Sequence, residues 1–169
     1  MRSLTSLRRN DPSSSGVSLL ELLVVLILLA IGVTLTLPNI SAWVEKYRVG
    51  KAARQLVTDL QYTKSRAVSH KVQHRASFDS AGTSYRIEQG NASSGSTVWS
   101  QIGVARSLSD PENPHYAKGV VLATSFPDNT VVFSTRGTAS PAGTVSLTSA
   151  NYARHVTVIL TGRIRSDRG

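Results

Sequence analysis

The sequence predicts an α+β fold in which a long N-terminal helix precedes an antiparallel β-sheet domain. From residue 17 to about residue 70, apolar residues either fill the chain or recur at spacings of three and four, which is typical of helices. From residue 74 onward, short stretches alternate apolar and polar residues between breaks rich in glycine, proline and serine. We therefore expect the helix to pack on a C-terminal sheet.

Length and composition limit the classes of function. The 169 residues are enough for one membrane segment and one modest soluble core, which excludes a multi-domain enzyme. The chain has 19 Lys and Arg against 10 Asp and Glu, so lipid headgroups, nucleic acid or an acidic protein surface are plausible partners. The absence of cysteine excludes thiolate chemistry, cysteine zinc sites and disulfides.

The first 37 residues predict a leader followed by a membrane helix. Residues 1–16 are basic and then rich in serine, and we interpret them as a cytoplasmic leader peptide. Residues 17–37 contain one ionisable side chain, Glu21, and a helix of this length spans about 30 Å. Because the positive charges precede the span, we expect a single-pass inner-membrane protein with a cytoplasmic N-terminus and a periplasmic C-terminal domain.

Residues 38–72 predict an amphipathic continuation of this helix. Pro38 is expected to kink or interrupt it. The apolar face is expected to contain Ile40, Trp43, Tyr47, Leu56, Leu60, Thr63 and Ala67. The opposite face is basic, and we interpret it as a solvated face or one that lies near anionic headgroups.

Residues 73–169 predict an antiparallel sheet with short connections. RASFD and SYRIE flank the turn-forming pair Ala81 and Gly82, which indicates a first hairpin. Further strands are expected at TVWSQI, GVVLAT, NTVVFST, GTVSLTS and YARHVTVIL. The loops between them are rich in residues that break helices and strands.

The carboxylate of Glu21 needs a partner, because a charge near the bilayer centre costs roughly 2.5 to 3.5 kcal/mol. If the chain is cut after Gly16, the new α-amine belongs to Val17 and lies one helical turn from Glu21. That amine is mostly protonated near neutral pH. It can pair with Glu21 of its own chain or of a neighbouring subunit, and the second arrangement would favour assembly. The alternative is an uncleaved signal anchor in which Glu21 reaches the cytoplasmic interface.

The segment Gly16-Val17-Ser18-Leu19-Leu20-Glu21-Leu22-Leu23-Val24-Val25-Leu26 resembles the prepilin signature of type IV pilins and type II secretion pseudopilins. The resemblance implies cleavage after Gly16 by a prepilin peptidase, N-methylation of Val17 and docking of Glu21 on a neighbouring subunit. It also implies the type IV pilin-like fold. Val17 departs from the phenylalanine that is usual at this position.

Three C-terminal segments resemble the family shared by minor pseudopilin H of general secretion and the minor pilin FimT. They are residues 133–138, 143–147 and 161–165. The resemblance implies a minor pseudopilin of a type II secretion system, which assembles with other pseudopilins into a periplasmic filament or its tip and supports protein export. The alternative is a FimT-like pilin that acts in pilus biogenesis or DNA uptake. Neither reading implies a cofactor or an enzymatic activity.

Arginines near the C-terminus are the candidate DNA-binding residues. If Arg163 and Arg165 lie on a strand, they point to the same face about 6.6 Å apart, close to two phosphate steps along a DNA strand. Arg168 and Arg154 are expected to extend this patch. Such binding would be independent of sequence. The alternative, which we prefer, is a solvated basic tail.

Two possible metal sites are weak. His70 and His74 have a spacing suited to a shared metal, but no third ligand is identifiable. Asp110, Glu112 and Asn113 offer oxygen ligands, but the full series of calcium ligands is missing. We therefore expect no metal site.

Overall fold

The computed structural model describes residues 17–168, and it describes their side chains except at residues 33–39 and 168. The leader and Gly16 lie outside the described residues. The chain divides into two compact units, Met1–Asn39 and Ile40–Gly169. The fold of the second unit is the part that places the candidate sites.

Helix α1 runs from Leu19 to His70. Its first turn is closed by the Ser18 carbonyl, which accepts hydrogen bonds from the Glu21 and Leu22 N–H groups at 3.0 and 3.1 Å. The helix continues through Pro38, so the proline does not interrupt it. Among the residues whose side chains are described, 17–32 and 40–167, no helix shows the length and apolar character needed to cross a bilayer. Residues 33–37 of the predicted span are among those whose side chains are not described.

The second half of α1 buries a different set of residues from the one expected. Leu56, Leu60, Thr63 and Ala67 are buried as predicted, but Ile40, Trp43 and Tyr47 are exposed, Trp43 by 66% and Tyr47 by 56%. The nine-residue step from Tyr47 to Leu56 turns the helix by about two and a half turns, which places the two groups on opposite sides. Spacings of three and four within each group were therefore correct, but the two groups do not form one face.

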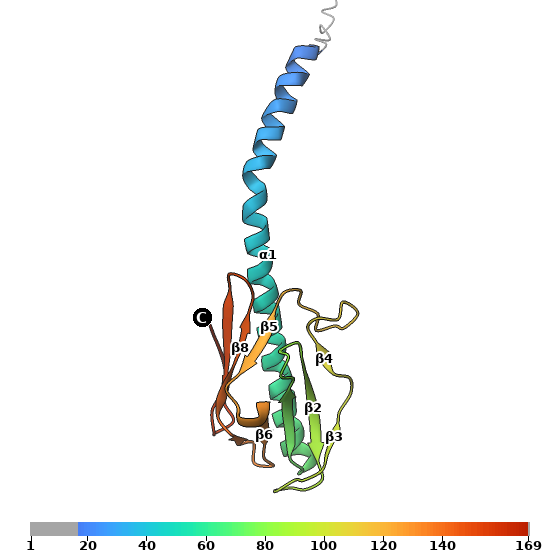
Figure 1. Cartoon of the computed structure of the whole chain (residues 1–169), viewed down its shortest axis with the longest axis vertical. Coiled ribbons are helices and arrows are strands. Elements are labelled where there is room, and N and C mark those ends of the chain that lie inside the picture. The colour runs from blue at the N-terminus through green and yellow to red at the C-terminus, as the bar shows by residue number, and fades with distance from the viewer. Residues whose placement is uncertain (1–16, 169) are drawn as a thin grey trace, which may run out of the picture. The chain divides into compact units, whose positions relative to one another are not determined.

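The β domain is antiparallel as predicted, and its strands divide into two sheets (Figure 1). The first has the order β3-β2-β1-β6-β7, with β4 also paired to β2. Its strands are β1 (His74–Phe78), β2 (Ser84–Gly90), β3 (Trp99–Gln101), β4 (Arg106–Ser107), β6 (Thr130–Phe133) and β7 (Ala139–Ser140). The second has the order β10-β9-β8-β5. Its strands are β5 (Val121–Thr124), β8 (Gly143–Thr148), β9 (Ala153–Val158) and β10 (Ile164–Arg168). A 3₁₀ turn, η1 (Pro127–Asn129), precedes β6.

The hydrophobic core lies between the two sheets and one face of α1. Leu56, Phe133 and Val156 are fully buried and represent the helix and the two sheets. Every residue of the described core cluster lies between Val49 and Val158. The unit Ile40–Gly169 therefore contains the whole of this core, and we expect it to fold as an isolated fragment.

A partly buried polar network ties α1 to the first sheet. One carboxylate oxygen of Asp59 accepts hydrogen bonds from the Tyr85 hydroxyl at 2.6 Å, from Arg106 Nε at 3.3 Å and from His115 Nε2 at 3.1 Å. Burial raises the pKa of Tyr85 far above its ordinary value, and the Asp59 charge adds to this, so the phenol stays a donor. Through His115, the same carboxylate holds the long loop between β4 and β5.

Two glycines bring two turns into backbone contact. Gly137 and Gly162 have φ angles of 82° and 73°, in the left-handed region that favours glycine. A Cβ atom on Gly162 would collide with the carbonyl oxygen of Gly137. The contact joins the turn before β7 to the turn before β10, so position 162 requires glycine for space as well as for conformation, whereas position 137 requires it for conformation.

We predict that Gly162→Ala destabilises the Ile40–Gly169 fragment more than Gly119→Ala does. Gly119 also has a left-handed φ of 76°, but its added Cβ would meet nothing within 4 Å. Gly119→Ala should cost about 1 to 2 kcal/mol of unfolding free energy. Gly162→Ala should cost roughly 3 kcal/mol or more, because the backbone must also move. Urea denaturation measures both, and equal losses would show that the close contact contributes nothing.

We also predict that the fragment loses stability as the pH falls below about 6.5. His74 is fully buried. Burial lowers its pKa from the ordinary 6.5, and the nearby positive charges of Arg66 and His70 act in the same direction. The folded state therefore excludes a proton that the unfolded state binds, so stability is complete above that pH and declines below it.

His74→Gln should flatten this decline, measured as unfolding free energy between about pH 7.5 and 5. His155→Gln, which replaces a histidine bonded to Ser146 on the outer face of the second sheet, is the control. If the unfolding free energy of His74→Gln fell with pH as steeply as that of the unchanged fragment, His74 would not be the group responsible.

Candidate functional site

The described part of the prepilin-like segment begins at Val17. Val17 and Ser18 precede the helix, and Glu21 lies exposed in its first turn. Because Gly16 lies outside the described residues, the geometry of the cleavage site stays a prediction.

Arg163 and Arg165 share one face of the second sheet, as the period of two predicts. They line an open hollow of about 300 Å³ together with Thr157, Ile159 and Asp167. Arg165 Nε donates to the Asp167 carboxylate at 2.9 Å, so a negative charge lies within the basic group. The sequence did not indicate that this aspartate would join the arginines.

Of the other two candidate arginines, Arg154 does not extend this face. Arg154 is two and four residues before the buried Val156 and Val158 on β9, so its side chain is on the same face, the core side of the sheet. Arg168 pairs with Arg154 in the backbone ladder, and its side chain lies outside the described set. The structure therefore brings together two of the four predicted arginines.

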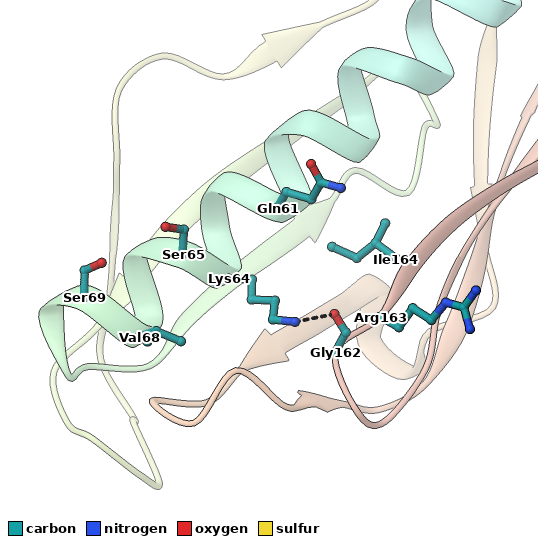
Figure 2. Close-up of a pocket in the computed structure, with 8 residues that line it drawn as sticks. All are labelled: Gln61, Lys64, Ser65, Val68, Ser69, Gly162, Arg163 and Ile164. Atoms are coloured by element: carbon teal, nitrogen blue, oxygen red, sulfur yellow. Dashed lines mark hydrogen bonds between the residues drawn. The ribbon is translucent and has the colours of Figure 1, made fainter.

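A groove lies between α1 and the segment 162–164 (Figure 2). Its volume is about 470 Å³, and it is lined by Gln61, Lys64, Ser65, Val68, Ser69, Gly162, Arg163 and Ile164. Lys64 Nζ donates to the Gly162 carbonyl at 2.9 Å, so a cationic side chain crosses from α1 to the segment 162–164 (Figure 2). No pattern in the sequence indicated this groove, because its two sides are about a hundred residues apart in the chain.

Strand β10 forms one edge of the second sheet and pairs with β9. The Ile159 N–H donates to the Arg163 carbonyl at 3.1 Å, so the backbone of Arg163 faces β9. Along an antiparallel strand, the N–H and C=O groups of successive residues point alternately toward one neighbouring strand and toward the other side. The N–H and C=O groups of Ile164 and Ser166 therefore point away from β9, toward the free edge.

The weaker candidates have structural roles. The Asp110 carboxylate accepts from the Glu112 N–H at 3.0 Å, and the Asn113 side-chain oxygen accepts from the His115 N–H at 3.0 Å. These side chains hold the shape of their own loop. The rings of His70 and His74 are 6.0 Å apart, and no group of three metal-ligating side chains occurs among the residues that the structure describes.

Sequence comparisons match two family models. Residues 52–162 match the family described as type II transport protein GspH. Residues 11–37 match the prokaryotic N-terminal methylation motif. No curated protein sequence matches the chain.

Solved structures of low sequence identity share the fold. The minor pseudopilin EpsH from the type 2 secretion system of Vibrio cholerae is 15% identical with a TM-score of 0.55, over 72% of this chain and 97% of that one. The type IV minor pilin FimU of Pseudomonas aeruginosa is 18% identical with a TM-score of 0.53, over 74% and 92%. E. coli GspH is 12% identical with a TM-score of 0.52, over 72% and 89%. With the fold type IV pilin-like and the family model matched over most of the β domain, this chain belongs to the type II transport protein GspH family.

Proposed function

We propose that this protein is a minor pseudopilin of a type II secretion system. The GspH family match over residues 52–162 carries the proposal. The methylation motif over residues 11–37 supports the processing that such a subunit needs. The role is structural and non-enzymatic: the subunit joins a periplasmic filament or its tip and supports protein export.

The N-terminal segment supplies the proposed assembly mechanism. A prepilin peptidase removes residues 1–16, and the new amine at Val17 carries the positive charge that Glu21 needs in the membrane. Residues 17–37 hold the subunit in the inner membrane, with the β domain in the periplasm. Pairing between Glu21 of one subunit and the Val17 amine of the next then sets the register, because an unpaired charge in lipid is costly.

A FimT-like role in pilus biogenesis or DNA uptake is the second candidate. The TM-score to the minor pilin FimU, 0.53, lies between those to EpsH and to E. coli GspH, so the fold favours neither system. The shared face of Arg163 and Arg165 would supply contacts to phosphates. Asp167 on the same face weakens this candidate.

We predict that Glu21→Ala blocks assembly but not membrane insertion. Loss of the paired charge should reduce incorporation into filaments at least about tenfold, since 1.4 kcal/mol already corresponds to tenfold. The measurement is co-purification with the other pseudopilins, with Glu112→Ala in an exposed loop as the control. Mass spectrometry should find both variants cleaved after Gly16. Normal incorporation would refute the role of Glu21, and an intact N-terminus at Met1 would refute processing.

For a secretion subunit, we predict that the Ile40–Gly169 fragment shows no DNA binding that depends on Arg163 and Arg165. Fluorescence anisotropy at two salt concentrations measures it, with Arg163→Ala/Arg165→Ala and the control Arg154→Ala. Two lost phosphate contacts would lower the salt slope by about 1.8. Salt-sensitive binding that only the double variant abolishes would favour the DNA-uptake pilin.

A further inference from the structure

We propose that the free edge of β10 binds an extended segment of another protein that carries acidic residues at alternate positions. The segment would add to the second sheet as a further strand and lie along the groove beside α1. The inference rests on the geometry of the described domain and holds for either filament system, so it does not depend on the proposed secretion role.

The backbone of β10 offers the hydrogen bonds that such a strand requires. The N–H and C=O groups of Ile164 and Ser166 point away from β9, and β10 has no second neighbour in the described sheet. An added strand gains main-chain hydrogen bonds from these groups without disturbing the ladder to β9. In strand addition, main-chain bonds supply affinity and side-chain contacts supply specificity.

The charges beside this edge favour acidic residues on the outer face of the added strand. Arg163 and Arg165 project from that face and line the hollow described above. Opposite charges on directly facing strand positions attract one another, whereas like charges repel. The Asp167 carboxylate accepts a hydrogen bond from Nε of Arg165 and lies on the same face, so acidic residues are favoured opposite Arg163 and Arg165 but not opposite Asp167.

The groove favours small or apolar residues on the opposite face of the added strand. Ile164 is partly buried against the core and Val68 is 37% exposed, and both line the groove (Figure 2). Ser65 and Ser69 add small side chains to the same lining, and Lys64 bonds the Gly162 carbonyl across it. A segment with apolar and acidic residues in alternation therefore matches both faces of the edge.

Charged residues also occur on edge strands that avoid pairing. A protected edge, however, needs no groove beside it. Here the groove of about 470 Å³ lies next to Ile164, whose backbone groups point outward, and its volume is within the range of ligand pockets. This arrangement is what distinguishes a docking edge from a protected one.

The test uses the Ile40–Gly169 fragment and an eight-residue fluorescent peptide that alternates valine and glutamate. We expect saturable binding by anisotropy. A peptide N-methylated on the residues that would face β10 should bind at least tenfold more weakly, since it cannot donate those bonds. A peptide with lysine in place of glutamate should also lose binding.

Variants of the fragment separate the contribution of the arginine charges from that of the main-chain hydrogen bonds. Arg163→Glu/Arg165→Glu should weaken binding at least tenfold, whereas Arg54→Glu, at an exposed position of α1 away from the groove, should not. Ser166→Pro should weaken binding because it removes an outward N–H. The N-methylated peptide tests the same bond on the unchanged fragment if that variant fails to fold.

Amide hydrogen exchange gives the decisive readout. The peptide should slow exchange at the Ile164 and Ser166 N–H groups more than at the Arg165 N–H, which faces β9. No binding would identify β10 as a protected edge and overturn the proposal. Equal binding of the N-methylated peptide, or no change in exchange, would show charge attraction without strand addition and would also overturn it.

Discussion

The burial of one face of α1 between two sheets is the constraint on which the rest of the domain depends. Leu56 and Leu60 contribute large, fully buried side chains to a core that also contains Phe133 and Val156. Because neither sheet can remove its apolar face from water alone, both must meet the helix. The placement of every candidate site in the β domain follows from this packing.

Much of the fold could be predicted from local sequence pattern. The hairpin around Gly82 and the main strands follow from alternation and turn residues. The division into two sheets could not be predicted, because it depends on which strands pair over long separations. Strands β4 and β7 have two residues each, too few to show a pattern.

In the candidate sites, too, local pattern predicts some features, whereas others depend on strands that pair over long separations. That Arg163 and Arg165 share a face follows from the strand period alone. That Asp167 joins them, that Arg154 lies on the other side and that β10 is an edge beside α1 all depend on sheet order. The Asp59 network was also missed, since its members come from the helix, two strands and a loop. Each member is a single residue of a common type, so no sequence pattern indicates that they form a network.

The change of apolar face along α1 has a consequence for how this chain can evolve. The exposed Trp43 and Tyr47 and the buried Leu56 and Leu60 are held at a fixed rotation about the helix axis by the number of residues between them. One inserted or deleted residue would turn one group by about 100° relative to the other, whereas substitutions at exposed positions leave the rotation unchanged. Selection on this stretch should therefore act on its length as well as on its buried residues Val49, Ala52 and Ala53.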